Sequence, residues 1–402
     1  MKNISALPRT AMRAGLTALV LSVSASSSMA QSIAIGDKEV QVHGSLQQGF
    51  GLTNENNFLT MNTTRGSAEM TDAAINVSSR PTPKLRLGAQ LYVRNIGQLG
   101  NGALQLDWAF ADYKFTDALG VRAGKIKTVL GLFTDTQDME FLYTWALLPQ
   151  GTYPLDLRSI TIAHVGADAY GAVKLGKAGS LAYTAYAGVV ADDDRGGYRY
   201  GVQDAGLGFR AGVTSHGGGF DTRWTTPVNG LMTGYSFTQN TDSVDLVVEA
   251  YRLPFNATTK PSRRQAAYAD YQASRLRLSG EARRELMDTV LTPAVYAEAV
   301  TRSASSFVAA SYRLAKQLEV GSYYSHYVYD TALPSSNQDN HLFDTAVTGR
   351  VDLNRFWNVK VEGHFIDGNG SPTLARGFYR RDNVSGFNAK THMLVIRTGV
   401  NF

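Results

Sequence analysis

The stretch "RLRLSGEARRE", residues 275–285, alternates between apolar and charged side chains. Leu276, Leu278 and Ala282 share one face of an extended chain. The opposite face carries charged side chains, namely Arg275, Arg277, Glu281, Arg283 and Glu285. A period of two residues indicates a β-strand whose two faces meet different surroundings. Similar alternation recurs in residues 40–52, 85–95, 357–365 and 395–402, so we predict an all-β fold.

Short turns and long polar segments alternate between the strands. The predicted turns are 80–84, 116–120, 174–180, 226–230, 271–274, 314–317 and 353–356. The long segments are 53–69, 96–102, 130–167, 191–218, 240–263, 286–303, 330–340 and 368–390. These connections predict sixteen antiparallel strands with both termini on the turn side, and residues 206–214 and 243–251 leave eighteen strands as the alternative. Short periplasmic turns and long external loops are typical of a transmembrane β-barrel.

A secreted β-sandwich also alternates, but it buries its apolar face in a core. In this chain charged residues such as Arg86, Lys360 and Arg397 recur on one face of distant strands, which favours a shared wet lumen. A sheet that spans a bilayer must close on itself, because lipid cannot satisfy free backbone groups. Sixteen strands enclose an aqueous channel. We expect the last strand, which ends at Phe402, to close the barrel with Ile396 facing lipid and Arg397 facing the channel.

Residues 1–30 are predicted to be a secretory signal peptide. Lys2, Arg9 and Arg13 precede a short apolar run, 14–25, and the small residue Ala30 ends the cleavage site. The run is too short for a membrane helix. We therefore expect residues 31–402 to form the barrel domain in the outer membrane of a Gram-negative cell. Without the three basic residues the formal net charge falls from +5 to +2, which gives nucleic-acid binding little support.

Several stretches resemble a known family. "VRAGKIKTVLGLFTDTQDMEFLYTWALLPQG" (121–151) and "HVGADAYGAV" (164–173) resemble outer-membrane porins of the phosphate-selective porin O and P type and their dicarboxylate-channel relatives. Residues 224–237 and 311–325 are similar to hairpins of the same family. Lys125 replaces the family's usual arginine and Val129 its usual proline, which weakens a transfer of phosphate specificity. The resemblance implies a sixteen-stranded homotrimer in outer-membrane lipid and lipopolysaccharide, with the third loop folded into each pore.

The third loop, residues 130–167, is the longest, and long loops often carry function. We expect it to fold inward, with a short helix at 139–148 and an acidic constriction formed by Asp135, Asp138 and Glu140. The predicted pore-lining cations are Arg86, Arg94, Lys125, Lys127, Arg158, Arg223, Arg275, Arg277, Arg283, Arg313, Arg350, Lys360 and Arg397. Lys125 and Lys127 share the parity of apolar Val121, so a β-bulge is needed to turn them inward.

Basic candidates outnumber acidic ones on the predicted wall, and rings of Arg and Lys favour anions. The sequence therefore predicts a passive channel that favours small organic anions such as dicarboxylates, and mutual neutralisation of the wall would make it a non-selective porin. A barrel enzyme acting on lipids is less favoured, since the seven histidines are scattered and neither GxSxG nor HExxH occurs. Cysteine is absent, and no cofactor or metal site is predicted; "ADDDRGG" (191–197) is interpreted as a solvated loop.

Overall fold

The computed structural model describes residues 31–35, 38–190, 193–293, 299–334, 336–370 and 376–402, so the predicted signal peptide lies outside the described residues. The first barrel strands are β2 (Lys38–Thr53), β3 (Ser67–Ser79), β4 (Leu85–Ile96), β5 (Leu104–Thr116), β6 (Leu119–Lys127), β7 (Ala163–Lys174) and β8 (Ser180–Val190). The others are β10 (Thr214–Thr225), β11 (Leu231–Val248), β12 (Leu253–Ala273), β13 (Leu276–Thr292), β14 (Ala299–Ala315), β15 (Leu318–Val328), β16 (His341–Asp352), β17 (Trp357–Gly368) and β18 (Lys390–Asn401).

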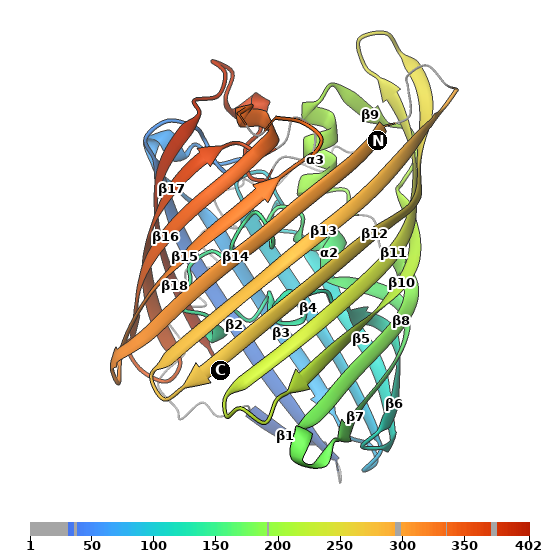
Figure 1. Cartoon of the computed structure of the whole chain (residues 1–402), viewed down its shortest axis with the longest axis vertical. Coiled ribbons are helices and arrows are strands. Elements are labelled where there is room, and N and C mark those ends of the chain that lie inside the picture. The colour runs from blue at the N-terminus through green and yellow to red at the C-terminus, as the bar shows by residue number, and fades with distance from the viewer. Residues whose placement is uncertain (1–30, 36–37, 191–192, 294–298, 335, 371–375) are drawn as a thin grey trace, which may run out of the picture.

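These sixteen antiparallel strands form one closed ring in the described part of the chain (Figure 1). β18 pairs with β2 to close it, and the backbone of Phe402 continues this pairing with Gly44 through hydrogen bonds of 2.9 and 3.0 Å. The prediction of sixteen strands is confirmed. All seven predicted turns join consecutive strands at one end of the barrel, which we call the turn side; the opposite end is the long-loop side.

Two short strands lie outside the ring. β1 (Gln31–Ile35) pairs with one end of β2, and β9 (Leu207–Phe209) pairs with the end of β11 on the long-loop side. β9 and that end of β11 are the two segments that left eighteen strands open, and they pair with each other without widening the barrel. In the part of the chain that the structure describes, the α-helices are α2 (Arg158–Thr161) and α3 (Gly197–Asp204). Among the described residues, no helix has the length and hydropathy needed to cross a membrane.

The predicted loops 240–263 and 286–303 are wrong. Strands β11 to β14 continue through most of both segments: β11 ends at Val248 and β12 begins at Leu253, and β13 extends to Thr292 and β14 begins at Ala299. Their hairpins extend from the long-loop side of the barrel (Figure 1). The pairing register shifts between Asn240 and Ser243 and between Lys260 and Arg263, which breaks the alternation of the sequence there. Backbone pairing persists beyond the apolar belt, where the polar side chains no longer alternate.

The two faces of the barrel differ as the alternation predicts. Leu87 and Leu91 on the outer face of β4 are 42% and 39% exposed, whereas Tyr92 and Arg94 on its inner face are 5% and 2% exposed. On β18, Ile396 is exposed and Arg397 is buried. Apolar side chains repeat over the outer surface of the ring, and an apolar surface of this kind is stable only against lipid. The fold is therefore a transmembrane β-barrel.

Candidate functional site

The connection between β6 and β7, residues 128–162, crosses the lumen and is called loop 3 here. Its apolar side chains pack on the inner wall: the cluster contains Leu132, Phe133, Tyr143, Trp145 and Tyr153 from loop 3 and Tyr268, Phe307, Ala309, Tyr323 and Ala346 from the strands. Phe133 stacks on Phe307 with ring centroids 5.8 Å apart, and Trp145 meets Tyr323 edge-on at 5.3 Å. The inward fold of the third loop is confirmed.

Two buried carboxylates of the wall bind backbone amides of loop 3. Glu362 on β17 accepts hydrogen bonds from the N–H groups of Ala146 and Leu147 at 3.0 and 2.9 Å. Glu281 on β13 accepts from the N–H of Leu132 at 2.8 Å and from the Tyr153 hydroxyl. The expected helix at 139–148 is wrong, because the structure has only a 3₁₀ turn at Glu140–Leu142. The Glu362 side chain of the wall binds the backbone N–H groups of Ala146 and Leu147, which an α-helix would use in its own hydrogen bonds.

Basic wall residues bind backbone carbonyls of the same loop. Lys360 donates to the carbonyls of Glu140 and Trp145 at 2.8 and 2.9 Å. Arg350 donates to those of Phe141 and Tyr143, both at 2.8 Å. Further contacts run from Arg397 to the Ala146 carbonyl at 3.0 Å and from Arg283 to the Thr152 and Leu130 carbonyls at 3.1 and 3.3 Å. These predicted wall cations therefore hold loop 3 in place.

The three acidic residues predicted at the constriction are each paired with a wall cation. The ion pairs are Asp135 with Arg223 at 3.0 Å, Asp138 with Lys127 at 2.6 Å and Glu140 with Lys360 at 2.5 Å. The acidic side chains of loop 3 and these cations of the wall thus neutralise each other locally. Lys127 lies at the end of β6, where the chain turns into loop 3, and its amine also contacts the Asp135 carbonyl at 3.1 Å.

Most of the other predicted cations also have carboxylate partners. The pairs are Arg94 with Asp193 at 3.3 Å, Arg158 with Asp107 at 2.7 Å, Arg277 with Asp270 at 2.8 Å, Arg283 with Glu281 at 2.8 Å, Arg313 with Glu319 at 2.5 Å, and Arg397 with Asp72. Asp193 belongs to the segment interpreted as a solvated loop, yet it is buried against Arg94. Such pairing lowers the excess positive charge that the sequence suggested for the wall.

Three predicted pore residues are placed differently. Arg275 lies in the exposed turn between β12 and β13, and Arg86 is exposed near the turn-side end of β4. The Lys125 amine donates to the Leu106 carbonyl of the neighbouring strand at 2.6 Å, so it binds the sheet and not loop 3. The expected β-bulge occurs in β5 instead of β6: the register with β4 shifts there, and Asp107 is left without a β4 partner.

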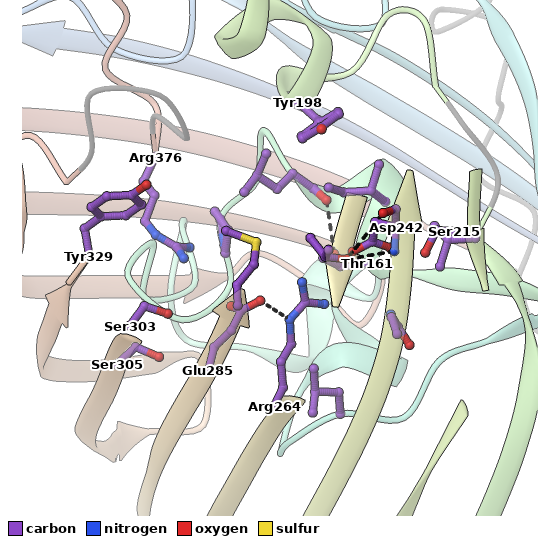
Figure 2. A pocket seen from close by; sticks show the side chains of 18 of the residues that line it. Thr161, Tyr198, Ser215, Asp242, Arg264, Glu285, Ser303, Ser305, Tyr329 and Arg376 are labelled. Carbon is purple, nitrogen blue, oxygen red and sulfur yellow. Dashed lines mark hydrogen bonds and ion pairs between the residues drawn. The ribbon is translucent and has the colours of Figure 1, made fainter. Parts of the chain in front are cut away.

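A cavity of about 330 Å³ lies between loop 3 and strands β11 to β14, toward the long-loop side (Figure 2). Its polar lining includes Glu285, which the alternation places on the charged face of its strand, and Arg264 and Arg376, which are not among the predicted pore residues. Arg264 directly follows the segment predicted as the loop 240–263, and it alternates with Ala266 and Tyr268 along β12. Arg376 lies in an aperiodic loop and gives no sequence signal. The described residues contain no cluster of His, Cys, Asp and Glu side chains that is arranged to hold a metal ion.

Loop 3 also contacts loop 8, the residues 369–389 between β17 and β18. Asp156 of loop 3 is fully buried and accepts hydrogen bonds from the Tyr379 hydroxyl at 2.6 Å and from the Gly377 N–H at 2.9 Å. Burial raises the pKa of Asp156, and these two hydrogen bonds oppose that rise. The buried carboxylate ties the inward loop to the external loops above it.

Loop 4, residues 191–213, also contacts loop 8. The Tyr200 hydroxyl of α3 donates to Asp382 at 3.0 Å, and Asp204 accepts the N–H groups of Arg380 and Arg381 at 2.7 and 2.8 Å. Burial, followed by the nearby charge of Asp204, raises the pKa of Asp382 to about 6, although the hydrogen bond from Tyr200 opposes this. The external contact therefore contains a carboxyl that titrates near neutral pH.

Solved structures resemble this barrel at low sequence identity. OmpT of Vibrio cholerae, described as outer-membrane expressed, gives a TM-score of 0.59 at 11% identity and covers 92% of this chain and 100% of its own. The chain shares its fold. The anion-selective porin from Comamonas acidovorans gives 0.55 at 12% identity, covering 91% and 100%. The outer membrane channel DcaP of Acinetobacter baumannii gives 0.51 at 11% identity, covering 91% and 97%. No protein-family model and no curated protein matches the sequence.

Proposed function

We propose that the chain is an outer-membrane porin, a water-filled channel for the passive diffusion of small solutes. The observation that carries this proposal is loop 3, which lies across the lumen of a closed barrel and separates two cavities. One cavity, of about 330 Å³, is on the long-loop side, and another, of about 540 Å³ and lined by Arg350 and Asp352, is on the turn side. An inward loop of this kind narrows a lumen that strands alone would leave wide.

The finer proposal is a preference for small anions, including dicarboxylates and other organic acids. Arg376 supports it, because among the described residues no carboxylate lies within ion-pair distance of this lumenal cation. The fold shared with an anion-selective porin also supports it. A non-selective diffusion porin is the second candidate, and the ion pairs Arg277–Asp270 and Arg283–Glu281 favour it, since paired charges attract ions weakly.

Reversal potentials in planar bilayers separate these functions. Under a tenfold KCl gradient, an anion-preferring channel gives a potential of the sign expected for chloride permeation, and a non-selective channel gives one close to zero. Arg376→Glu is expected to shift the potential toward cation selectivity. Arg380→Glu, on an exposed residue of the same loop, is the control and is expected to leave it unchanged. A folded barrel that conducts no ions would overturn the porin proposal itself.

The oligomeric state and the cellular location of the protein are proposed together with its function. We propose a homotrimer in outer-membrane lipid and lipopolysaccharide, and one structure of the same fold is described as a trimer form. The mass of the detergent-solubilised protein, measured by light scattering, tests the trimer. Membrane fractionation tests the location in the outer membrane. The N-terminal sequence of the exported protein tests the signal peptide, and we expect the mature chain to begin at Gln31.

A further inference from the structure

The cavity between loop 3 and strands β11 to β14 has two chemically distinct ends. Figure 2 shows Arg376 and Tyr329 at one end, Asp242 and Ser215 at the other, and Arg264 and Glu285 between them. Its volume of about 330 Å³ is at the lower limit of small-molecule sites, which run from about 300 to 1,000 Å³. The site therefore suits a solute the size of a single ring with its substituents.

Positive charge is available at the Arg376 end. Arg264 is already paired, because its Nε donates to Glu285 at 2.6 Å. The guanidinium of Arg376 lies over the ring of Tyr327, 3.8 Å from its centroid. Its Nε is buried and has no hydrogen-bond partner among the described residues. Because Arg376 also lines the cavity, the charge of its guanidinium group is available there to an acceptor such as a carboxylate.

The opposite end is lined by apolar side chains. Val202 and Val244 are buried in one cluster, against which Tyr198, Val213 and Ala257 pack, and all five line the cavity. They come from α3, the end of loop 4, β11 and β12, so one part of the chain, residues 198–257, builds this surface. A second carboxylate on the solute would lie against this apolar surface and close to Asp242, and both would disfavour its charge.

We propose that this cavity binds an organic anion with one acidic group and an apolar body. The carboxylate binds Arg376, and the body packs on the surface formed by Val202, Val244 and Ala257. This inference rests on the proposed function and narrows it, because it selects monocarboxylates with an apolar body from the small organic anions and disfavours dicarboxylates and phosphate at this position.

Equilibrium binding to the folded protein in detergent tests the proposal. Calorimetric titration with benzoate is expected to show saturable binding at one site per chain. Cyclohexanecarboxylate is expected to bind with similar affinity, and succinate and phosphate at least about tenfold more weakly, because an uncompensated buried charge costs more than a factor of ten. Equal affinity for succinate, or no binding of benzoate, would overturn the proposal.

Two pairs of variants assign the ends of the site. Arg376→Gln is expected to weaken benzoate binding about tenfold or more, as for the loss of a charge-assisted hydrogen bond, and Arg380→Gln in the same loop is its control.

Val244→Thr keeps the size of the side chain but adds a hydroxyl, so it should weaken benzoate binding several-fold. Val247→Thr on the same strand, which does not line the cavity, is its control. Unchanged affinity in Arg376→Gln or Val244→Thr counts against the site, and heat-modifiable gel mobility verifies that each variant is folded.

Binding and conduction are measured separately, so the two proposals fail in different ways. Benzoate binding with the predicted variant effects, in a barrel that carries no current, would overturn the porin and keep the site. A conducting channel that does not bind benzoate would overturn the site and keep the porin.

Discussion

Lys360 is a cation with 0% of its side chain exposed, yet it lies in the lumen of the barrel. Its ammonium group contacts the Glu140 carboxylate at 2.5 Å and the carbonyls of Glu140 and Trp145 at 2.8 and 2.9 Å. An ammonium has three donors, and these contacts occupy all of them. A buried charge is tolerated only when it is paired and hydrogen-bonded. Lys360 therefore fastens residues 140–145 of loop 3 to β17.

Removing this cation should release part of loop 3. Lys360→Met keeps the side-chain length, removes three contacts and leaves Glu140 buried without its partner, a loss of about 3–5 kcal/mol for buried pairs. We expect faster amide hydrogen exchange in 139–147 and a larger, noisier single-channel conductance. Lys114→Met is the control, because Lys114 pairs with Asp117 at an exposed turn. Unchanged exchange and conductance in Lys360→Met would contradict the role assigned to Lys360.

At the scale of elements, the barrel strands were predictable wherever their two faces meet different surroundings. Leu87 and Arg94, or Ile396 and Arg397, alternate because one face meets lipid and the other the lumen. The same logic failed for the ends of β11 to β14 on the long-loop side, where Val244 and Phe255 pack against α3 and β9 and the register of β12 shifts near Lys260. Periodicity predicts barrel strands only where the apolar face is the lipid face, and beyond the lipid that relation is lost.

The site was predictable only in part for a related reason. Strand parity selects inward residues such as Arg283 and Lys360, but it contains no information about their partners. Lys360 binds Glu140, which is 220 residues away along the chain, and only the closed barrel brings them together. Arg376 could not be selected because its loop has no period. The sequence therefore predicts which charges are available but not which of them remain unpaired.

A row of glycines crosses four neighbouring strands. Gly124 on β6 pairs with Gly166 on β7, Gly166 with Gly188 on β8, and Gly188 with Gly217 on β10. A Cβ atom on Gly166 would lie 2.1 Å from the Ala187 carbonyl oxygen, and one on Gly188 would lie 2.5 Å from that of Val165. No side chain fits at such distances from backbone. We infer that the row marks a line where the sheet bends, as glycines allow at the corners of barrels.

A methyl group in this row should strain the barrel. We expect Gly166→Ala to lower stability by about 1–3 kcal/mol, the usual cost of overpacking, because the neighbouring strand must move away. The measurement is the temperature at which the folded band converts to the unfolded band on a gel. Gly363→Ala on β17 is the control, since a Cβ atom there meets nothing within 4 Å. If both variants convert at the same temperature, the glycine row does not determine the bend.

At the scale of the whole molecule, one hydrogen-bonded network connects the loop after β2 with loops 3, 4 and 8 on the long-loop side. The Leu59 N–H, in the loop that follows β2, donates to the Gly377 carbonyl of loop 8 at 2.7 Å. Loop 8 contacts loop 3 through Asp156 and loop 4 through Asp382. Chain segments more than 300 residues apart in sequence thus share one hydrogen-bonded network, as Asn57 and Asn383 illustrate with a separation of 326. A change in one contact should therefore reach the constriction.

Acid should tighten the contact between loops 4 and 8. The pKa of Asp382 is about 6 in the folded chain, above its ordinary 3.8, so the folded loops take up a proton as the pH falls through about 6. By linkage, the stability of the contact between these loops increases as the pH falls from 7 to 5. This added stability is lost again as the pH rises through about 6. Amide exchange of residues 377–383, corrected for the intrinsic rate, should be slower at pH 5. Asp382→Asn should abolish this dependence, and Asp194→Asn on an exposed residue of loop 4 should retain it. Faster corrected exchange at pH 5 in the unmodified protein would contradict this prediction. It would mean that acid loosens the contact between loops 4 and 8 and that the charged form of Asp382 stabilises it.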